Sequence, residues 1–216
     1  MQALSYIAII GVLLNISSCG KLGKCEGKSR MDYEFVLPVT ISPAKDTFRV
    51  GDTIWIENSF SNQLLNHRNG KTYEVENFNF ETTMAIKDLN TVFPAVSYSK
   101  PLIITYEGKT TGNYIQSSDY EALYIDYDYK DGFYRYKAAF ILDKAGFYLI
   151  DFFSYMDGNK VDITSCANET LYMEYVTNNR GDNNYEMIKY SKDHKFSKLT
   201  IENYNKEGCY CFHVVQ

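Results

Sequence analysis

Residues 122–155 read ALYIDYDYKDGFYRYKAAFILDKAGFYLIDFFSY. Three runs in this stretch, 122–129, 133–142 and 146–155, are rich in tyrosine, phenylalanine and isoleucine, which favour the half-buried surface of a β-sheet. Lys130-Asp131-Gly132 separates the first two runs, and Asp and Gly tolerate the positive φ of a tight hairpin turn. The stretch therefore predicts β-strands that are joined by short connections.

The same pattern extends outward to cover the chain from Tyr33 to its C-terminus. Asn69-Gly70 and Met156-Asp157-Gly158-Asn159 are further turn signals. The region 178–206 is polar, and within it only residues 185–190 predict one or two helical turns. The remaining predicted strands are 33–41, 53–60, 73–80, 82–88, 102–106, 171–176 and 209–215. The predicted fold class is all-β, as an antiparallel sandwich or barrel.

Composition is that of a folded chain with a substantial core. Of 216 residues, 16% are aromatic and 23% are charged, so the chain can bury a core and is not disordered. The 27 acidic and 22 basic side chains give a formal charge of −5, which argues against nucleic acid as a partner. One core is the simpler organisation at this length, and residues 33–216 are predicted to form a single domain.

The N-terminus predicts a cleaved lipoprotein signal peptide over residues 1–18. The apolar run from Leu4 to Ile16, about thirteen residues, is too short to span a bilayer and is typical of a signal sequence. It leads into Ile16-Ser17-Ser18-Cys19, which resembles the bacterial lipobox, in which the cysteine thiol is acylated before cleavage. The alternative is a buried apolar helix of a cytosolic protein. No Lys or Arg precedes Ile7, which departs from the usual signal peptide.

Residues 19–32 follow the lipobox as a Gly- and Lys-rich stretch without hydrophobic period, which predicts a flexible tether. We expect Cys19 to anchor the mature protein to the outer membrane through its acyl chains. Lipoproteins that are exported to the cell surface usually carry acidic residues after this cysteine, whereas this chain has Lys21, Lys24 and Lys28. The predicted location is therefore the periplasmic face.

Three sequence segments resemble segments of the small lipoproteins of the Bacteroidota that carry an immunoglobulin-like β-sandwich. They are residues 48–56 (FRVGDTIWI), 144–149 (KAGFYL) and 208–214 (GCYCFHV). The resemblance implies an immunoglobulin-like sandwich in which Gly51-Asp52 turns the chain into a central strand. It implies no activity and no functional residue, because that family has no agreed activity. Trp55 is expected to be buried between the sheets.

The last predicted strand contains two cysteines and a histidine, which are residue types that bind metals. Side chains two residues apart in a strand lie about 6.5–7 Å apart, so Cys209, Cys211 and His213 do not converge as zinc ligands must. The same spacing disfavours a Cys209–Cys211 disulfide. In an oxidising compartment we expect a disulfide from Cys166 to Cys209 or to Cys211. No metal and no cofactor are predicted.

The acidic and tyrosine-rich segment 119–132 has two interpretations. Asp126, Asp128 and Asp131 resemble a calcium loop only superficially, because Gly132 comes one place too late and Lys137 occupies the position of the final acid. A polar hairpin at a sheet edge is the simpler interpretation. The alternative is a glycan-binding surface in which Tyr127 and Tyr129 stack on sugar rings.

Catalytic motifs are lacking from the sequence. It has three histidines and neither a nucleophile elbow, a zinc-protease helix nor a phosphate-binding loop. The tripeptide Arg180-Gly181-Asp182 is short enough to arise by chance in a surface loop. We therefore expect a lipoprotein that is not an enzyme, a structural or protein-interaction module of the cell envelope with an envelope protein as partner. The alternative is a glycan-binding envelope lipoprotein.

Overall fold

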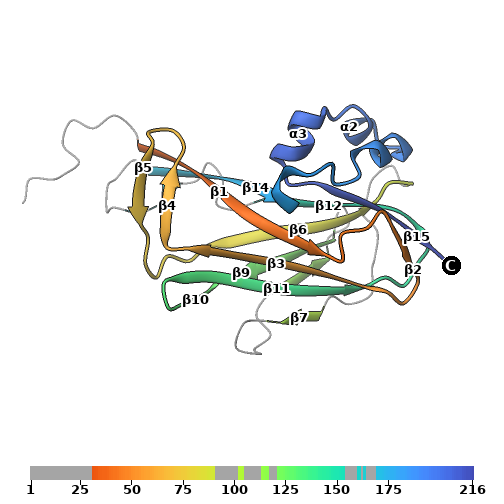
Figure 1. The fold of residues 1–216 in the computed structure, drawn as a ribbon, viewed down its shortest axis with the longest axis horizontal. Coiled ribbons are helices and arrows are strands. Elements are labelled where there is room, and N and C mark those ends of the chain that lie inside the picture. The colour runs from red at the N-terminus through yellow and green to blue at the C-terminus, as the bar shows by residue number, and fades with distance from the viewer. Residues whose placement is uncertain are drawn as a thin grey trace, which may run out of the picture.

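The computed structural model describes residues 31–90, 102–104, 113–116, 121–153, 160, 161, 163 and 169–216. These residues form two β-sheets that pack face to face, with a two-stranded hairpin at one end and short helices near the other (Figure 1). The predicted all-β sandwich is confirmed.

The first sheet runs in the order β10, β11, β3, β1, β14 and β13, with β7 also beside β11. These strands are Asp128–Lys130, Phe133–Ile141, Thr53–Ser61, Met31–Ser42, Glu169–Thr177, Lys160–Val161 and Leu102–Ile104. The second sheet runs in the order β2, β15, β12, β6, β9 and β8. Its strands are Thr47–Arg49, Tyr210–Val215, Gly146–Phe153, Glu81–Asp88, Glu121–Asp126 and Asn113–Gln116. Most neighbours are antiparallel, but β1 pairs with β14, and β2 with β15, in parallel.

In strand β11, the alternation of apolar and polar residues determines which side chains face the core. Tyr134, Tyr136 and Phe140 are buried between the sheets, while Arg135 and Lys137 point to the other side, as a period of two requires. The preceding turn has a φ of 52° at Asp131 and 76° at Gly132. Two consecutive positive φ values are typical of a type I′ hairpin turn, so the predicted turn is confirmed.

The segment around Gly51 connects the second sheet to the first. Arg49 ends β2 in the second sheet, and Thr53 begins β3 in the first. Gly51 has a φ of 94°, which favours glycine, and the Asp52 carboxylate accepts a hydrogen bond from the Arg49 backbone at 3.0 Å. The predicted turn at Gly51-Asp52 is present.

Trp55 corrects one prediction. Its neighbours Ile54 and Ile56 are fully buried, so the pleat turns the indole to the outer side of the first sheet, where it is half-exposed. The Lys137 ammonium lies 5.1 Å from its ring centroid. The expectation that Trp55 is buried between the sheets was wrong.

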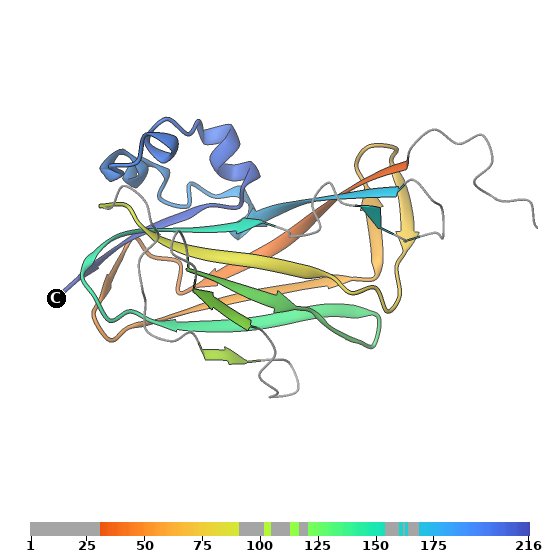
Figure 2. The same ribbon diagram turned by 180° about the vertical axis from the view of Figure 1, so that it is seen from behind.

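A helical cap, residues 178–207, covers part of the outer face of the second sheet (Figure 2). It contains η1 (Asn178–Arg180), η2 (Tyr185–Tyr190), α2 (His194–Ser197) and α3 (Ile201–Lys206). The sequence predicted only the helical turns at 185–190. The cap and sheet share a second buried cluster, separate from the main core: Leu89, Leu149, Ile188, Phe196, Tyr204, Cys209 and Cys211.

Asparagine side chains fix the start of the cap. Asn178, Asn179, Asn183 and Asn184 all have positive φ, which asparagine tolerates better than most residues. The Asn178 side chain accepts a hydrogen bond from the Ile41 backbone at 2.9 Å, and Asn184 donates to the Cys211 carbonyl at 2.7 Å. These bonds tie the cap to both sheets.

The tripeptide Arg180-Gly181-Asp182 lies in this same loop. Arg180 forms an ion pair with Glu174 at 2.7 Å. The Asp182 carboxylate accepts a hydrogen bond from the Tyr185 backbone at 3.1 Å. Both charged side chains thus have partners within the molecule, which agrees with the interpretation as an ordinary surface loop.

Candidate functional site

Two predicted site residues fall outside the described part of the chain. They are Cys19, the predicted acylation site, and Cys166, a candidate for the predicted disulfide. Among the described residues, no helix is long and apolar enough to cross a membrane.

The tyrosines proposed for glycan stacking lie in and against the core. Tyr127 is 8% exposed, and its ring packs against Phe60 with centroids 5.1 Å apart. Tyr129 is half-buried, lies 4.6 Å from the Tyr134 ring and accepts a hydrogen bond from Asn62 at 3.3 Å. A sugar needs a free ring face, and Tyr127 offers none. The prediction that Tyr127 stacks on a sugar was therefore wrong, while stacking at the half-buried Tyr129 stays a prediction.

Cys209 lies just before β15 and Cys211 lies in it. Both are fully buried under the helical cap, and neither forms a disulfide with another described residue. Burial raises the pKa of Cys211 to about 12, although the Tyr204 hydroxyl lowers it in part. His213 is half-buried, and its ring stacks on Phe147 with centroids 4.1 Å apart. Because Cys166 is not described, a disulfide from Cys166 to Cys209 or Cys211 stays a prediction.

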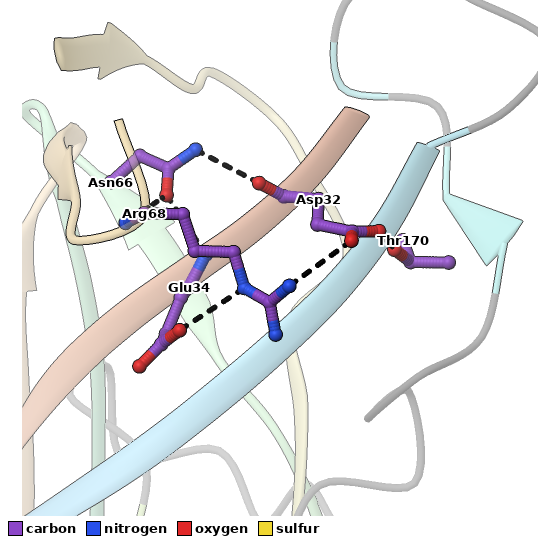
Figure 3. A network of polar contacts seen from close by, with 5 residues as sticks. All are labelled: Asp32, Glu34, Asn66, Arg68 and Thr170. Carbon is purple, nitrogen blue, oxygen red and sulfur yellow. Dashed lines mark hydrogen bonds and ion pairs between the residues drawn. The ribbon is translucent and has the colours of Figure 1, made fainter. Parts of the chain in front are cut away.

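A network of polar side chains lies around the start of β1 (Figure 3). The Arg68 guanidinium lies between two acids of β1, 3.0 Å from the Asp32 carboxylate and 3.1 Å from the Glu34 carboxylate. It also lies over the Tyr172 ring of β14, 4.5 Å from its centroid. The Thr170 hydroxyl of β14 donates to the Asp32 carboxylate. One arginine thus joins the start of β1 to β14.

Asn66 supports this network from the hairpin of β4 (Gln63–Asn66) and β5 (Lys71–Glu74). Its fully buried side chain donates to the Asp32 carbonyl and accepts from the Glu34 backbone, both at 3.1 Å. The Arg68 backbone donates to the same side-chain oxygen at 3.0 Å. A buried amide with three partners is a fixed contact. The hairpin therefore holds the first residues of β1, to which the predicted tether connects.

The outer face of β3 and β11 presents aromatic and apolar side chains beside cations. We call this surface the Trp55 face and define it by Trp55, Glu57, Ser59, Phe133, Arg135, Lys137 and Ile141. Phe133 is 39% exposed and Ile141 48% exposed. The Arg135 guanidinium lies 4.8 Å from the Phe133 ring centroid, and Lys137 pairs with Glu57 at 3.3 Å. Trp, Phe and Arg are residue types enriched at protein interfaces.

We expect the protein to unfold at alkaline pH, and we expect its buried tyrosines to ionise at a higher pH than exposed tyrosines do. Burial raises the pKa of Tyr134 and of Tyr148 to about 12, and raises that of Tyr127 and Tyr136 as well. A raised folded-state pKa means that these groups favour folding below the unfolded-state pKa of about 10. Stability should then fall as pH rises from about 10 through 12. Phenolate absorbance and circular dichroism, followed together, check this.

If buried tyrosines ionise only as the β signal is lost, the expectation holds. Complete tyrosine ionisation near pH 10 with the fold intact would contradict it.

Comparisons with known proteins give little similarity. No protein-family model matches the chain. No curated protein matches it either. Among solved structures, a type II cohesin dyad from the adaptor ScaA scaffoldin of Acetivibrio cellulolyticus is similar at 10% identity and a TM-score of 0.30, covering 66% of this chain and 46% of that chain. A likeness this low assigns neither family nor function, and the sandwich described above rests on the structure itself.

Proposed function

We propose that this protein is a non-catalytic lipoprotein that is anchored through acylated Cys19 and binds another envelope protein through the Trp55 face. The observation that carries the proposal is that the outer face of β3 and β11 carries the half-exposed Trp55 and, at the two ends of β11, the exposed Phe133 and Ile141. Aromatic anchors beside Arg dominate binding energy at many protein interfaces.

The arrangement of the ends supports anchoring at one end of the molecule. The start of β1 and the β4–β5 hairpin lie at one end of the long axis, and the C-terminus lies at the other, as both views agree (Figures 1 and 2). A tether before β1 would hold the hairpin end toward the membrane. The Trp55 face runs along the side of the sandwich and would stay open to a partner.

Replacing Trp55 by alanine should lower capture of the partner about tenfold or more, because truncating a central aromatic anchor costs about 2 kcal/mol or more of binding. The measurement is quantitative affinity capture from detergent-solubilised envelopes. The matched control is Tyr190→Ala, because Tyr190 is a 47% exposed aromatic residue on the helical cap. Equal capture by wild type and Trp55→Ala would count against this face.

Changing Cys19 to alanine should abolish lipid attachment, since the thiol is the predicted acceptor. Incorporation of radiolabelled palmitate measures this, with Cys25→Ala as the control that keeps the label. Labelling that survives Cys19→Ala would remove the anchoring proposal. We propose the periplasmic face of the outer membrane as the location, because Lys21, Lys24 and Lys28 follow the cysteine. Protease treatment of intact cells should then leave the protein whole.

A further inference from the structure

We propose that the start of β1 is a mechanical clamp, through which the protein carries tension between its membrane anchor and a partner on the Trp55 face. The β4–β5 hairpin and β14 both hold the first residues of β1 (Figure 3). The tension rests on the proposed function, because it needs an anchored chain and a bound partner. The clamp itself is a property of the fold and can be measured without either.

On one side, β1 is held by β14. The two strands are parallel and stay in register over residues 31–39 of β1. Side chains reinforce the first pairs, because the Tyr33 hydroxyl donates to the Glu169 carboxylate at 3.0 Å and the Thr170 hydroxyl donates to the Asp32 carboxylate. Sliding β1 past β14 therefore breaks backbone and side-chain bonds together.

On the other side, the hairpin takes the place of a neighbouring strand. β3 pairs with β1 over residues 39–42. Before that point, the Asn66 carboxamide bonds to the Asp32 carbonyl and to the Glu34 amide. The His67 backbone amide donates to the Glu34 carbonyl at 2.9 Å. The start of β1 is thus bonded along both of its edges.

Arg68 connects the two sides of the clamp. Its guanidinium pairs with Asp32 at 3.0 Å and with Glu34 at 3.1 Å. It also lies 4.5 Å from the centroid of the Tyr172 ring, which belongs to β14. Hydrogen bonds between charged groups are stronger than those between neutral groups. Arg68 therefore links the hairpin, β1 and β14 at the point where the tether joins the fold.

The direction of a pull determines how these bonds are loaded. The start of β1 lies at one end of the long axis, and β1 runs lengthwise from there (Figures 1 and 2). A pull through the tether then acts along the strand and loads its hydrogen bonds at the same time, whereas a pull across a strand breaks them one after another. It must also move Tyr33, Phe35 and Leu37, which are fully buried, out of the core. The arrangement therefore resists a pull from the membrane.

Unfolding of the full chain at constant force tests the clamp, with one handle at Ser29 in the predicted tether and the other at Ser59 on the Trp55 face. Forced unfolding depends on the unfolding rate and not on equilibrium stability. Arg68→Ala should shorten the folded lifetime about fivefold, which corresponds to about 1 kcal/mol, the contribution of partly exposed ion pairs. The matched control is Arg180→Ala, because Arg180 pairs at 2.7 Å with Glu174 of β14 and not with β1.

We expect Arg180→Ala to keep the wild-type lifetime under force. Urea unfolding of both variants shows how far each changes equilibrium stability. An unchanged lifetime in Arg68→Ala, or equal shortening in the two variants, would overturn the clamp. The experiment needs neither lipid nor partner. Failure of palmitate labelling or of partner capture would therefore remove the proposed function and leave the clamp, whereas a failed force experiment would leave anchoring and binding untouched.

Discussion

Replacing Gly208 by alanine should destabilise the protein by about 2–5 kcal/mol, which combines the strain of a left-handed residue with overpacking of a core. Gly208 has a φ of 64°, and an added Cβ would lie 2.8 Å from the Tyr175 Cβ and 3.1 Å from the Tyr175 carbonyl oxygen. Its carbonyl also accepts a hydrogen bond from the buried Thr177 hydroxyl at 2.6 Å. Backbone must therefore move where the cap enters β15.

Gly70→Ala is the matched control for this prediction. Gly70 has a φ of 67°, but no atom lies within 4 Å of an added Cβ. Only the conformational cost remains there, about 1–2 kcal/mol. Urea unfolding of both variants separates the crowding at Gly208 from the shared strain. Equal destabilisation of Gly70→Ala and Gly208→Ala would show that the contact with Tyr175 has no effect.

Replacing Lys87 by methionine should cost about 2–4 kcal/mol, slightly below the range for breaking a fully buried ion pair. The Lys87 ammonium forms an ion pair with Asp151, and the two side chains are 21% and 9% exposed. It also lies 4.5 Å from the centroid of the Phe196 ring in α2. Its loss leaves the Asp151 carboxylate buried without its cation. Burial and then nearby Asp151 raise the pKa of Glu207, so further negative charge already lies close by.

Lys137→Met provides the comparison, because Lys137 also combines an ion pair with an aromatic contact but is 45% exposed. Exposed pairs contribute about 0–1 kcal/mol. The double variant Lys87→Met/Asp151→Asn should recover part of the loss, since it removes the buried charge. Chemical denaturation measures the free energy of unfolding of the two single variants and of the double variant. Equally small losses in the free energy of unfolding for Lys87→Met and Lys137→Met would show that burial does not strengthen the Lys87–Asp151 pair.

The sequence predicted the strands best where alternation and turn chemistry agree. β11 and its Asp131-Gly132 turn follow from a pleated pattern beside residues that accept positive φ. Predicted strand 73–80 was wrong over most of its length, because β5 ends at Glu74. The short hairpin β4–β5 is set by Asn66 bonding to β1, a contact between distant residues that no local pattern carries.

The candidate sites and the cap were harder to predict from the sequence than the strands. Trp55 was predicted to lie between the sheets, but Ile54 and Ile56 occupy that side of β3, and the pleat turns Trp55 outward. The helices of the cap are too short to show a helical period. Their cover of Cys209 and Cys211 depends on packing against the second sheet. Tyr127 could have been assigned to the core from its shared face with Ile125, which is fully buried.

Photo-crosslinking in intact cells can show whether the Trp55 face binds an envelope protein. A crosslinking residue is placed at Ser59, which is exposed on that face, or at Glu186, whose side chain is 81% exposed on the cap. We expect a discrete protein adduct from position 59 that disappears when Trp55→Ala is added, and no such adduct from position 186. Adducts from position 186 alone, or an adduct from position 59 that persists in Trp55→Ala, would contradict it.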